Sequence, residues 1–350
     1  MTGPLQLAWF AALCDDDYEQ LGVPDPSLTS SYAHCADIVH AADRAGFDAI
    51  LMPSGYALGI DTIAFTAAVA RSTRHITPIV AVRMGEVWVP QLARQLATLD
   101  QILGGRMVVN IISSELPGES LASAPRYRRT LEHMQALRTL LDGSALSMDG
   151  EFVNLSVEPP RVRTVRGHAP PLYFGGLSDD AREVAAQAAD VYLMWPDTMA
   201  GVADIIDDMQ SRAARHGRTL RFGYRVHVVV RETEAQARAA AEHLVAALDP
   251  EVGAAIRARS LDSRSVGVQA QASLRDAADM EGFVEPNLWT GIGRARSGCG
   301  AAIVGDPAQV AAKIRSYQRL GIDTFILSGY PHLEECERFA SLVMPLLRGA

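Results

Sequence analysis

Short apolar runs alternate with longer amphipathic stretches along nearly the whole chain. The short runs have the length that is typical of buried β-strands. Eight of them are predicted to be strands, at residues 5–12, 49–52, 76–82, 107–112, 172–174, 191–194, 220–230 and 324–327. Each run is followed by enough chain to hold a helix before the next one begins.

The amphipathic stretches carry apolar residues at helical spacing. They predict helices at residues 31–45, 61–72, 88–103, 126–141, 178–189, 198–216, 234–248 and 307–320, with a last helix at 333–347. Strands that are each followed by a helix indicate a parallel sheet with crossover helices. We interpret the fold class as α/β, a closed (β/α)8 TIM barrel with insertions, which needs about 250 residues. An open doubly wound sheet is the alternative, and the even spacing of the units favours the barrel.

Two segments interrupt this alternation. Residues 249–300 are polar, contain several Arg and Gly residues, and end in Gly298-Cys299-Gly300. Because long irregular loops are uncommon inside compact domains, we interpret this segment as an insertion before the last strand–helix unit, partly helical and forming a mobile lid. Residues 148–152 predict a small hairpin outside the barrel. The chain is interpreted as one domain over residues 1–350.

Composition and charge narrow the class of protein. Apolar residues make up 48% of the 350 positions, enough for a sizeable core, and 32 basic against 41 acidic residues give a net charge of −9. Non-specific binding of nucleic acid requires clustered positive charge, which an acidic chain lacks. We therefore expect no nucleic-acid partner.

Cysteine usage and apolar run lengths indicate a cytoplasmic protein. Cys14, Cys35, Cys299 and Cys336 are far apart in the sequence and form no CxxC pair. Such cysteines are typical of free thiols in a reducing compartment. The first residues show no basic stretch followed by an apolar run, and no apolar run approaches about 18 residues, so we expect neither a signal peptide nor a membrane span.

The strand at residues 220–230 carries the most informative pair of polar residues. Arg225 and His227 are two positions apart and therefore share one face of the strand. The alternate positions are apolar and suit the layer beneath the helices, so both side chains are predicted to point into the barrel. A buried arginine needs an anionic partner or ligand. No carboxylate recurs at matching strand positions, which favours a ligand anion over a structural ion pair.

A second candidate region follows the strand at residues 172–174. Gly175 and Gly176 permit close backbone approach, and Ser178 can cap the helix that begins there. The free N–H groups at a helix start suit a phosphate, although an ordinary helix cap would leave the same pattern. Tyr127, at the opening of another predicted helix, could add a hydroxyl; a packed tyrosine is the equal alternative.

The active sites of TIM barrels lie at the C-terminal ends of the strands. These ends also present Ser113, Trp195, Tyr330 and His332. The sequence contains no GxGxxG, Walker A, HExxH or GxSxG motif and no convincing metal-ligand spacing, so neither a metal site nor a nucleophile is predicted. A barrel with an inward Arg and His and an anion site suits an organic cofactor that carries the chemistry itself.

Several segments strongly resemble the bacterial luciferase-like flavin monooxygenases, in particular the alkanesulfonate monooxygenases. The similarity covers almost the whole chain, and its last motif is long and ordered, which makes it specific. The segments are residues 172–176 with Ser178, 192–195 (YLMW), 222–233 (FGYRVHVVVRET), 287–289 (NLW) and 321–335 (GIDTFILSGYPHLEE).

The resemblance implies both a fold and an activity. It implies a TIM barrel with an insertion near the seventh strand, and a monooxygenase that uses reduced FMN (FMNH2) and O2. A separate NAD(P)H-dependent flavin reductase would supply the FMNH2. Members of the family form a flavin C4a-(hydro)peroxide that oxygenates a small molecule, and they split alkanesulfonates into an aldehyde and sulfite. We also expect a homodimer or homotetramer.

The resemblance also assigns roles to residues. The residues that match the family's active-site positions are Trp195, Arg225, His227, Arg296, Tyr330 and His332. The expected cofactor contacts are Tyr127, Gly175, Gly176, Ser178 and Ser113, with Ser178 and Tyr127 at the FMN phosphate. Arg296 resembles a lid arginine that closes over the substrate and excludes water.

The chain departs from the family pattern in three loops. The family's active-site cysteine after the second strand is absent, and residues 56–58 (YAL) occupy that region. The loops after the third and fourth strands are acidic, and Glu86 or Glu115 near a sulfonate would repel it. A sulfonate or related organosulfur compound is the favoured substrate. The alternatives are the same chemistry on an aldehyde, an amine or a secondary metabolite, and a non-catalytic flavin-binding barrel.

Overall fold

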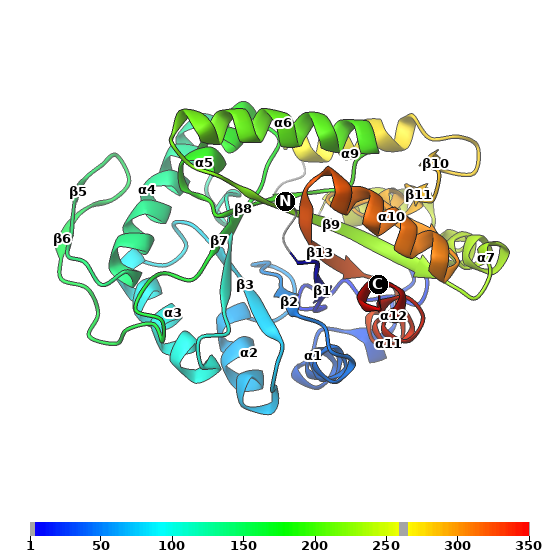
Figure 1. Cartoon of the computed structure of the whole chain (residues 1–350), viewed down its shortest axis with the longest axis horizontal. Coiled ribbons are helices and arrows are strands. Elements are labelled where there is room, and N and C mark those ends of the chain that lie inside the picture. Colours follow the sequence, from blue (N-terminus) through cyan, green and yellow to red (C-terminus); the bar gives the residue numbers. More distant parts are fainter. Residues whose placement is uncertain (1–3, 259–264, 350) are drawn as a thin grey trace.

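Eight parallel strands form a closed barrel at the centre of the molecule (Figure 1). The computed structural model describes residues 4–258 and 265–349. The strands of the ring are β1 (Gln6–Phe10), β2 (Ala49–Met52), β3 (Thr77–Arg83), β4 (Val108–Ile112), β7 (Leu172–Phe174), β8 (Val191–Met194), β9 (Arg221–Val230) and β13 (Ile322–Ser328). Neighbours pair in that order, and β13 pairs with β1 to close the ring. The predicted TIM barrel is confirmed, and the open sheet is excluded.

Helices surround the ring (Figure 1). They are α1 (Tyr32–Ala45), α2 (Thr62–Val69), α3 (Val89–Leu103), α4 (Ser123–Leu141), α5 (Asp179–Ala188), α6 (Met199–Arg215), α7 (Glu234–Val245), α10 (Pro307–Leu320), α11 (His332–Leu342) and α12 (Met344–Arg348), with short 3-10 turns η1 (Pro26–Leu28) and η2 (Ala70–Ser72). Several helix ends lie up to three residues from the prediction, and two differences change the interpretation. The helix α4 begins at Ser123, since Pro125 is tolerated in a first turn, and so Tyr127 does not open it. The last predicted helix is interrupted at Val343.

The two faces of β9 lie in different environments. Tyr224 and Val226 belong to the large core between the strands and the helices. Arg225 and His227 are 3% and 0% exposed, and the Arg225 guanidinium lies 4.4 Å from the ring of Phe10, which belongs to the cluster inside the barrel. The predicted inward orientation of the pair is therefore confirmed.

The described parts of residues 249–300, which are 249–258 and 265–300, contain five short elements and lead into an unpredicted strand. The elements are α8 (Pro250–Ala258), α9 (Val266–Asp276), β10 (Phe283–Glu285), β11 (Leu288–Trp289) and η3 (Gly291–Arg294). The strand β12 (Ala302–Gly305) then pairs in parallel with residues 227–230 of β9. It can do so because β8 pairs only with residues 221–224, which leaves the second half of β9 open on that side. The mobility of this segment as a lid stays a prediction.

One carboxylate joins the insertion to the barrel helices. Glu285 on β10 accepts hydrogen bonds from Lys313 Nζ (2.6 Å), Tyr317 OH (3.0 Å) and the backbone N–H of Met199 (3.1 Å). Lys313, the single lysine of the sequence, and Tyr317 lie on α10, whereas Met199 begins α6. Glu285 thus attaches the insertion, which carries Arg296, to α10 and α6.

Two further features lie outside the ring. The strands β5 (Leu146–Asp149) and β6 (Asn154–Val157) form an antiparallel hairpin at the predicted position. Figure 1 shows this hairpin beside α4 at the edge of the molecule. Within the described ranges, no helix is long and apolar enough to cross a membrane.

Candidate active site

Five of the six predicted active-site residues form one cluster at the C-terminal end of the barrel strands. Arg225 and His227 lie in β9, Tyr330 and His332 follow β13, and Arg296 comes from the insertion. Ring contacts and hydrogen bonds connect them: the Tyr330 ring lies 5.1 Å from both histidine rings, and its hydroxyl accepts a hydrogen bond from Arg296. Residues from β9, from the insertion and from the segment after β13 therefore meet in one place.

Arg225 is a buried cation whose partners are neutral. It donates hydrogen bonds to the Val226 carbonyl oxygen (3.0 Å) and to Ser328 Oγ (2.8 Å). Among the residues that the structure describes, no carboxylate forms an ion pair with it. Burial lowers the pKa of Arg225, in the direction expected for a charge without a close anionic partner. A guanidinium in this position is a strong binding site for an oxyanion.

His227 is a neutral histidine next to this cation. Its Nδ1 lies 2.7 Å from Ser328 Oγ, its ring stacks on Tyr330, and its Nε2 is buried without a hydrogen-bond partner. Burial, and then the charge of Arg225, hold the pKa of His227 well below its ordinary value. The ring is therefore uncharged at neutral pH and can donate or accept one hydrogen bond through Nε2.

Arg296 bridges the insertion to two other loops. Its Nη1 donates to Asp16 Oδ2 (2.6 Å), in the loop after β1, and to the Tyr330 hydroxyl (2.7 Å). Burial opposes the charge of Arg296, but Tyr330 and Asp16 outweigh it and raise the pKa of the guanidinium. Burial raises the pKa of Tyr330, so its hydroxyl stays protonated. These contacts fit the predicted role of Arg296 at the entrance of the barrel.

His332 lies within the cluster, whereas Trp195 lies against the insertion. The His332 ring is fully buried, its Nδ1 lies 2.8 Å from Asp17 Oδ1, and its Nε2 has no partner. Trp195 follows β8 and packs against the insertion, because a Cβ on Gly267 or Gly298 would lie 2.9 or 3.2 Å from the indole ring. Trp195 therefore touches the segment that carries Arg296 rather than the central cluster.

The start of α5, called the α5 cradle below, brings a glycine, a helix cap and a tyrosine hydroxyl together. Gly176 has φ +146°, a conformation that other residues rarely adopt, and a Cβ there would lie 2.7 Å from Ala181 Cβ and 3.4 Å from the Tyr127 hydroxyl. Ser178 caps the helix by accepting a hydrogen bond from the Ala181 N–H (3.2 Å). The first N–H groups of a helix have no acceptor within it. These donors and the Tyr127 hydroxyl therefore lie around one glycine.

Two of the other predicted cofactor contacts have structural partners of their own. A Cβ on Gly175 would collide with the Leu193 carbonyl oxygen on β8, so glycine is required there for β7 and β8 to pair. Ser113, which follows β4, accepts a hydrogen bond from the Thr130 hydroxyl on α4 (2.7 Å). Contact of Gly175 or Ser113 with a cofactor stays a prediction.

The acidic residues after β3 and β4 face arginines. Arg83, the last residue of β3, is buried. Its Nη1 lies 3.6 Å from Glu86 Oε2, and its Nε donates a hydrogen bond to Ser114 Oγ (2.6 Å). Arg126 lies 4.0 Å from Glu115. Each carboxylate thus has a cation beside it, which offsets the repulsion that Glu86 or Glu115 would exert on a bound anion.

Cys14 supplies a thiol near the position where the family cysteine is absent. A Cβ on Gly55, which follows β2, would lie 3.2 Å from Cys14 Sγ, so a thiol from the loop after β1 occupies this space. Burial, and then the charge of Asp16, raise the pKa of Cys14 to about 12. The thiol is protonated at neutral pH and is not an activated nucleophile.

Sequence reasoning did not select Cys14, Asp16, Asp17, Arg83 or Ser328 as site residues. Asp16, Asp17 and Ser328 form hydrogen bonds with residues of the cluster, and of the five only Ser328 lies in a quoted motif, at residues 321–335. The available signal was the run of three aspartates directly after the first strand, at an end of the sheet where active sites of barrels form. No group of residues suited to a metal ion occurs in the parts of the chain that the structure describes.

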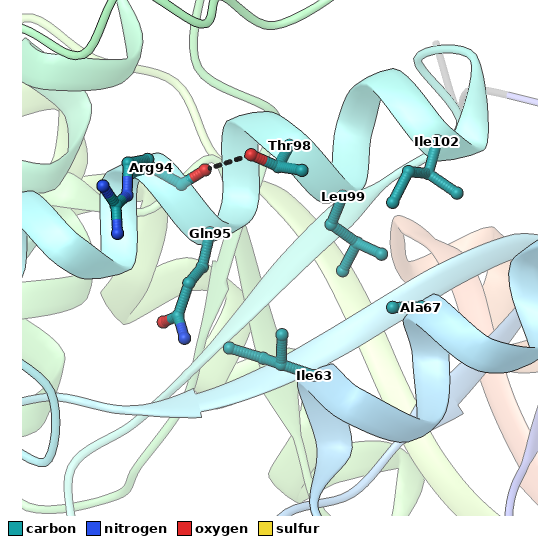
Figure 2. A pocket seen from close by; sticks show the side chains of 7 residues that line it. All are labelled: Ile63, Ala67, Arg94, Gln95, Thr98, Leu99 and Ile102. Atoms are coloured by element: carbon teal, nitrogen blue, oxygen red, sulfur yellow. Dashed lines mark hydrogen bonds between the residues drawn. The ribbon is translucent and has the colours of Figure 1, made fainter.

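A hollow of about 220 Å³ lies elsewhere, between α2 and α3 on the helix layer (Figure 2). Its lining residues are Ile63, Ala67, Arg94, Gln95, Thr98, Leu99 and Ile102. The hydrogen bond drawn there, from Thr98 Oγ1 to the Arg94 carbonyl oxygen (2.8 Å), is internal to α3. The hollow contains none of the residues at the strand ends, so it is not the candidate active site.

The sequence profile of the luciferase-like monooxygenases matches residues 10–324. The chain belongs to this family. Two relatives are similar over nearly their whole length. A sulfoquinovose monooxygenase of Novosphingobium aromaticivorans is 62% identical over 97% of this chain and 96% of its own length. A sulfoquinovose monooxygenase of Agrobacterium fabrum is 51% identical over 98% of this chain and 90% of its own.

Solved structures share the fold at low sequence identity. A riboflavin lyase determined with modified FMN and riboflavin superposes with a TM-score of 0.81 at 16% identity, covering 99% of this chain and 92% of the lyase. An EDTA monooxygenase from Chelativorans sp. BNC1 superposes with a TM-score of 0.78 at 18% identity, covering 99% and 94%. These likenesses support the luciferase-like form of the barrel. The predicted membership of the luciferase-like monooxygenases is thus confirmed, and the chain is a monooxygenase.

Proposed function

We propose that this monooxygenase uses reduced FMN and O2 to remove sulfite from a sulfonated sugar such as sulfoquinovose. The observation that carries the proposal is Arg225, a buried guanidinium without an anionic partner inside the barrel mouth. A buried charge left unpaired costs several kcal/mol, so a ligand anion is the natural partner. Neutral His227 beside it adds no negative charge that would oppose a sulfonate.

The relatives make the substrate more specific than a simple alkanesulfonate. Both are named for sulfoquinovose, which is a glucose whose C6 hydroxyl is replaced by a sulfonate. Its sulfonate sits on a primary carbon, as in an alkanesulfonate, so the same cleavage would yield an aldehyde at that carbon and sulfite. One oxygen atom of O2 enters the aldehyde, and the other leaves as water.

The cradle at the start of α5 fits the phosphate of FMN. Gly176 has no side chain to cover the start of the helix, and the Tyr127 hydroxyl and the helix N–H groups supply donors around it. Bound reduced FMN supplies the reducing equivalents for oxygen activation. Tyr127 and Ser178 would hold its phosphate, and we propose an NAD(P)H-dependent flavin reductase as the partner that delivers it.

The remaining residues act on the substrate and on solvent. Arg225 binds and orients the sulfonate, so that the carbon attached to sulfur is presented for oxygenation. Arg296, held by Asp16 and Tyr330, closes the entrance and excludes water. His227 and His332 each direct an unpaired ring nitrogen into the buried cluster and are suited to hold or move a proton.

Sulfite release is the direct test of this proposal. With FMN, NADH and a generic flavin reductase, the protein is expected to release sulfite from sulfoquinovose at a higher kcat/KM than from short alkanesulfonates. Glucose 6-phosphate, a tetrahedral anion on the same sugar carbon, is the control and should give no oxygenated product. If reduced flavin demonstrably reaches the enzyme and no sulfonate yields sulfite, desulfonation is refuted, while the monooxygenase family assignment still holds.

A charge at Ser178 is expected to weaken flavin binding. Ser178→Asp keeps a good helix cap but places a negative charge where the phosphate would lie, so the Kd for reduced FMN should rise by about tenfold or more. Ser178→Asn caps equally well without the charge and should stay within about threefold of the wild type. Anaerobic fluorescence titration measures both. Equal affinities for the two variants would place the phosphate elsewhere.

A further inference from the structure

A buried carboxylate connects His332 to a histidine near the surface. Asp17, in the loop after β1, accepts hydrogen bonds at Oδ1 from the His332 Nδ1 (2.8 Å) and the His332 backbone N–H (3.0 Å). Its other oxygen, Oδ2, accepts one from Nε2 of His34 on α1 (2.9 Å). The side chains of Asp17 and His332 are 0% exposed, and that of His34 is 12% exposed. The three groups form an unbroken row from the helix layer to the barrel mouth.

The charge of Asp17 determines which nitrogen of His332 carries a proton. Burial opposes that charge, but the His332 ring and the hydrogen bonds from both histidines lower the pKa of Asp17, so it is a carboxylate near neutral pH. A carboxylate only accepts hydrogen bonds, so Nδ1 of His332 must be the donor. In the neutral ring, Nε2 then has a free lone pair. This nitrogen is buried without a partner, in a ring packed between Phe10 and Tyr330.

His227 has the opposite arrangement on the other side of Tyr330. Ser328 Oγ accepts a hydrogen bond from Arg225 and lies 2.7 Å from His227 Nδ1. The Ser328 hydroxyl therefore donates its hydrogen bond to Nδ1, so Nδ1 is the acceptor and Nε2 carries the ring proton of neutral His227 as a donor. Tyr330 is thus flanked by one donor and one acceptor nitrogen, both unpaired.

His34 is the member of this row that is partly exposed to solvent, and its protonation changes the charge next to Asp17. The hydrogen bond to Asp17 raises the pKa of His34 against the effect of burial, and the nearby carboxylates Glu334 on α11 and Asp37 on α1 act in the same direction. The charged or titratable groups near His332 are Asp17, Tyr330, His227 and Arg296. A proton gained by His34 therefore offsets part of the Asp17 charge that faces His332.

We propose that His34 and Asp17 are positioning residues that hold His332 with Nε2 as a proton acceptor in the active site, and that protonation of His34 tunes this nitrogen. The catalytic part rests on the proposed function. Once the substrate carbon bears both a hydroxyl and the sulfonate, Nε2 takes the hydroxyl proton, the C=O bond forms, and the C–S bond breaks with its electron pair on sulfur. Sulfite leaves, and the imidazolium later returns the proton to solvent.

The ring protonation pattern can be measured without any substrate or cofactor. In protein labelled with 15N-histidine, the His332 signals, identified by their loss in His332→Gln, are expected to show a proton on Nδ1 and none on Nε2 at pH 8. Asp17→Asn should mix the two forms. A wild-type His332 with its proton on Nε2 overturns the proposal, even if sulfite release is real.

A matched pair of histidine variants tests the tuning. His34→Gln keeps a hydrogen-bond donor to Asp17 but removes the charge, and it is expected to move the acid limb of the kcat/KM profile to higher pH by roughly 0.5 to 1 unit. His40→Gln removes a histidine from the same helix whose hydrogen bond is to Ser72 (2.7 Å) and not to Asp17, and it should not move the profile. A uniform loss of activity without a shift in His34→Gln would mean that the row is only structural, and overturns the tuning.

A stability measurement separates failure of the inference from failure of the proposed function. The pKa of His34 is raised in the folded protein, so protonated His34 contributes to the free energy of unfolding. This stabilisation is fully present below the pKa of the unfolded chain, near 6.5, and is lost as the pH rises through the pKa of the folded protein. The Tm deficit of His34→Gln should therefore be largest near pH 5.5 and disappear toward pH 9. A deficit independent of pH contradicts the pairing of His34 with Asp17. If no sulfonate is a substrate, the NMR and Tm results still decide whether the row of His34, Asp17 and His332 behaves as proposed.

Discussion

Replacing Arg225 with alanine is expected to lower kcat/KM for a sulfonated substrate by roughly a hundredfold to a thousandfold. Truncating one member of a buried, hydrogen-bonded charge pair costs about 2 to 5 kcal/mol. Because the same group orients the carbon that is oxygenated, KM should rise and kcat should fall together. The kcat/KM of Arg225→Lys should exceed that of Arg225→Ala by less than about tenfold. An ammonium lacks the planar fork of a guanidinium, which pairs with two sulfonate oxygens.

Arg221 is the matched control for this experiment. It lies at the other end of the same strand, its side chain is 47% exposed, and it pairs with Asp323 (2.7 Å) away from the site. Arg221→Ala is expected to leave kcat/KM within about threefold of the wild type, because Arg221 lies at the opposite end of β9 from the cluster. Loss of its pairing with the buried Asp323 should appear in thermal unfolding instead. Steady-state sulfite assays and thermal unfolding on all three variants distinguish catalysis from folding. Unchanged KM in a folded Arg225→Ala would show that the anion binds elsewhere.

Replacing Arg296 with alanine is expected to uncouple flavin oxidation from substrate oxygenation. The variant loses the hydrogen bonds to Asp16 (2.6 Å) and Tyr330 (2.7 Å) that join the insertion to the loops after β1 and β13. Water should then reach the site, so that kcat falls by roughly tenfold to a hundredfold and most of the reduced flavin yields hydrogen peroxide instead of sulfite. The Kd for reduced FMN should stay nearly unchanged, because the α5 cradle is not altered.

Arg294→Ala controls for the loss of an arginine from the same segment. Arg294 is the last residue of η3 and its side chain is exposed, so peroxide and sulfite yields should match those of the wild type. Peroxide and sulfite are measured in the same reactions with a fixed supply of reduced flavin. If Arg296→Ala lowers kcat but leaves the ratio of peroxide to sulfite unchanged, Arg296 acts on the substrate and does not close the site.

The predicted site was most accurate for residues within regular strands. The two-residue spacing of Arg225 and His227 determines that both lie on one face of β9, and the structure places both inside the barrel. Their shared partner Ser328 lies on β13, about a hundred positions along the chain. Nothing local in the sequence links Ser328 to Arg225, because that contact depends on β9 and β13 being neighbours in the ring.

Contacts made by the loops were predicted less accurately than those within the strands. The strand β12 was missed because its partner is the open end of β9, which exists only once the ring has closed and β8 has stopped short. Asp16 and Asp17 were visible as part of an acidic run, but adjacent residues in a loop have no fixed spacing that assigns their directions. In the structure Asp16 binds the insertion, whereas Asp17 binds the first residue of α11.

The sequence by itself determined the barrel architecture and the presence of a cation and a histidine, Arg225 and His227, on the inner face of β9. Repeating apolar runs and helical spacing specify strand–helix units, because burial of apolar side chains depends on local periodicity. Only the tertiary structure decided the pairing of charges. The Arg296 bridge to Asp16 and the Asp17 carboxylate behind His332 join residues that are distant along the chain, and electrostatic interactions depend on separation in space.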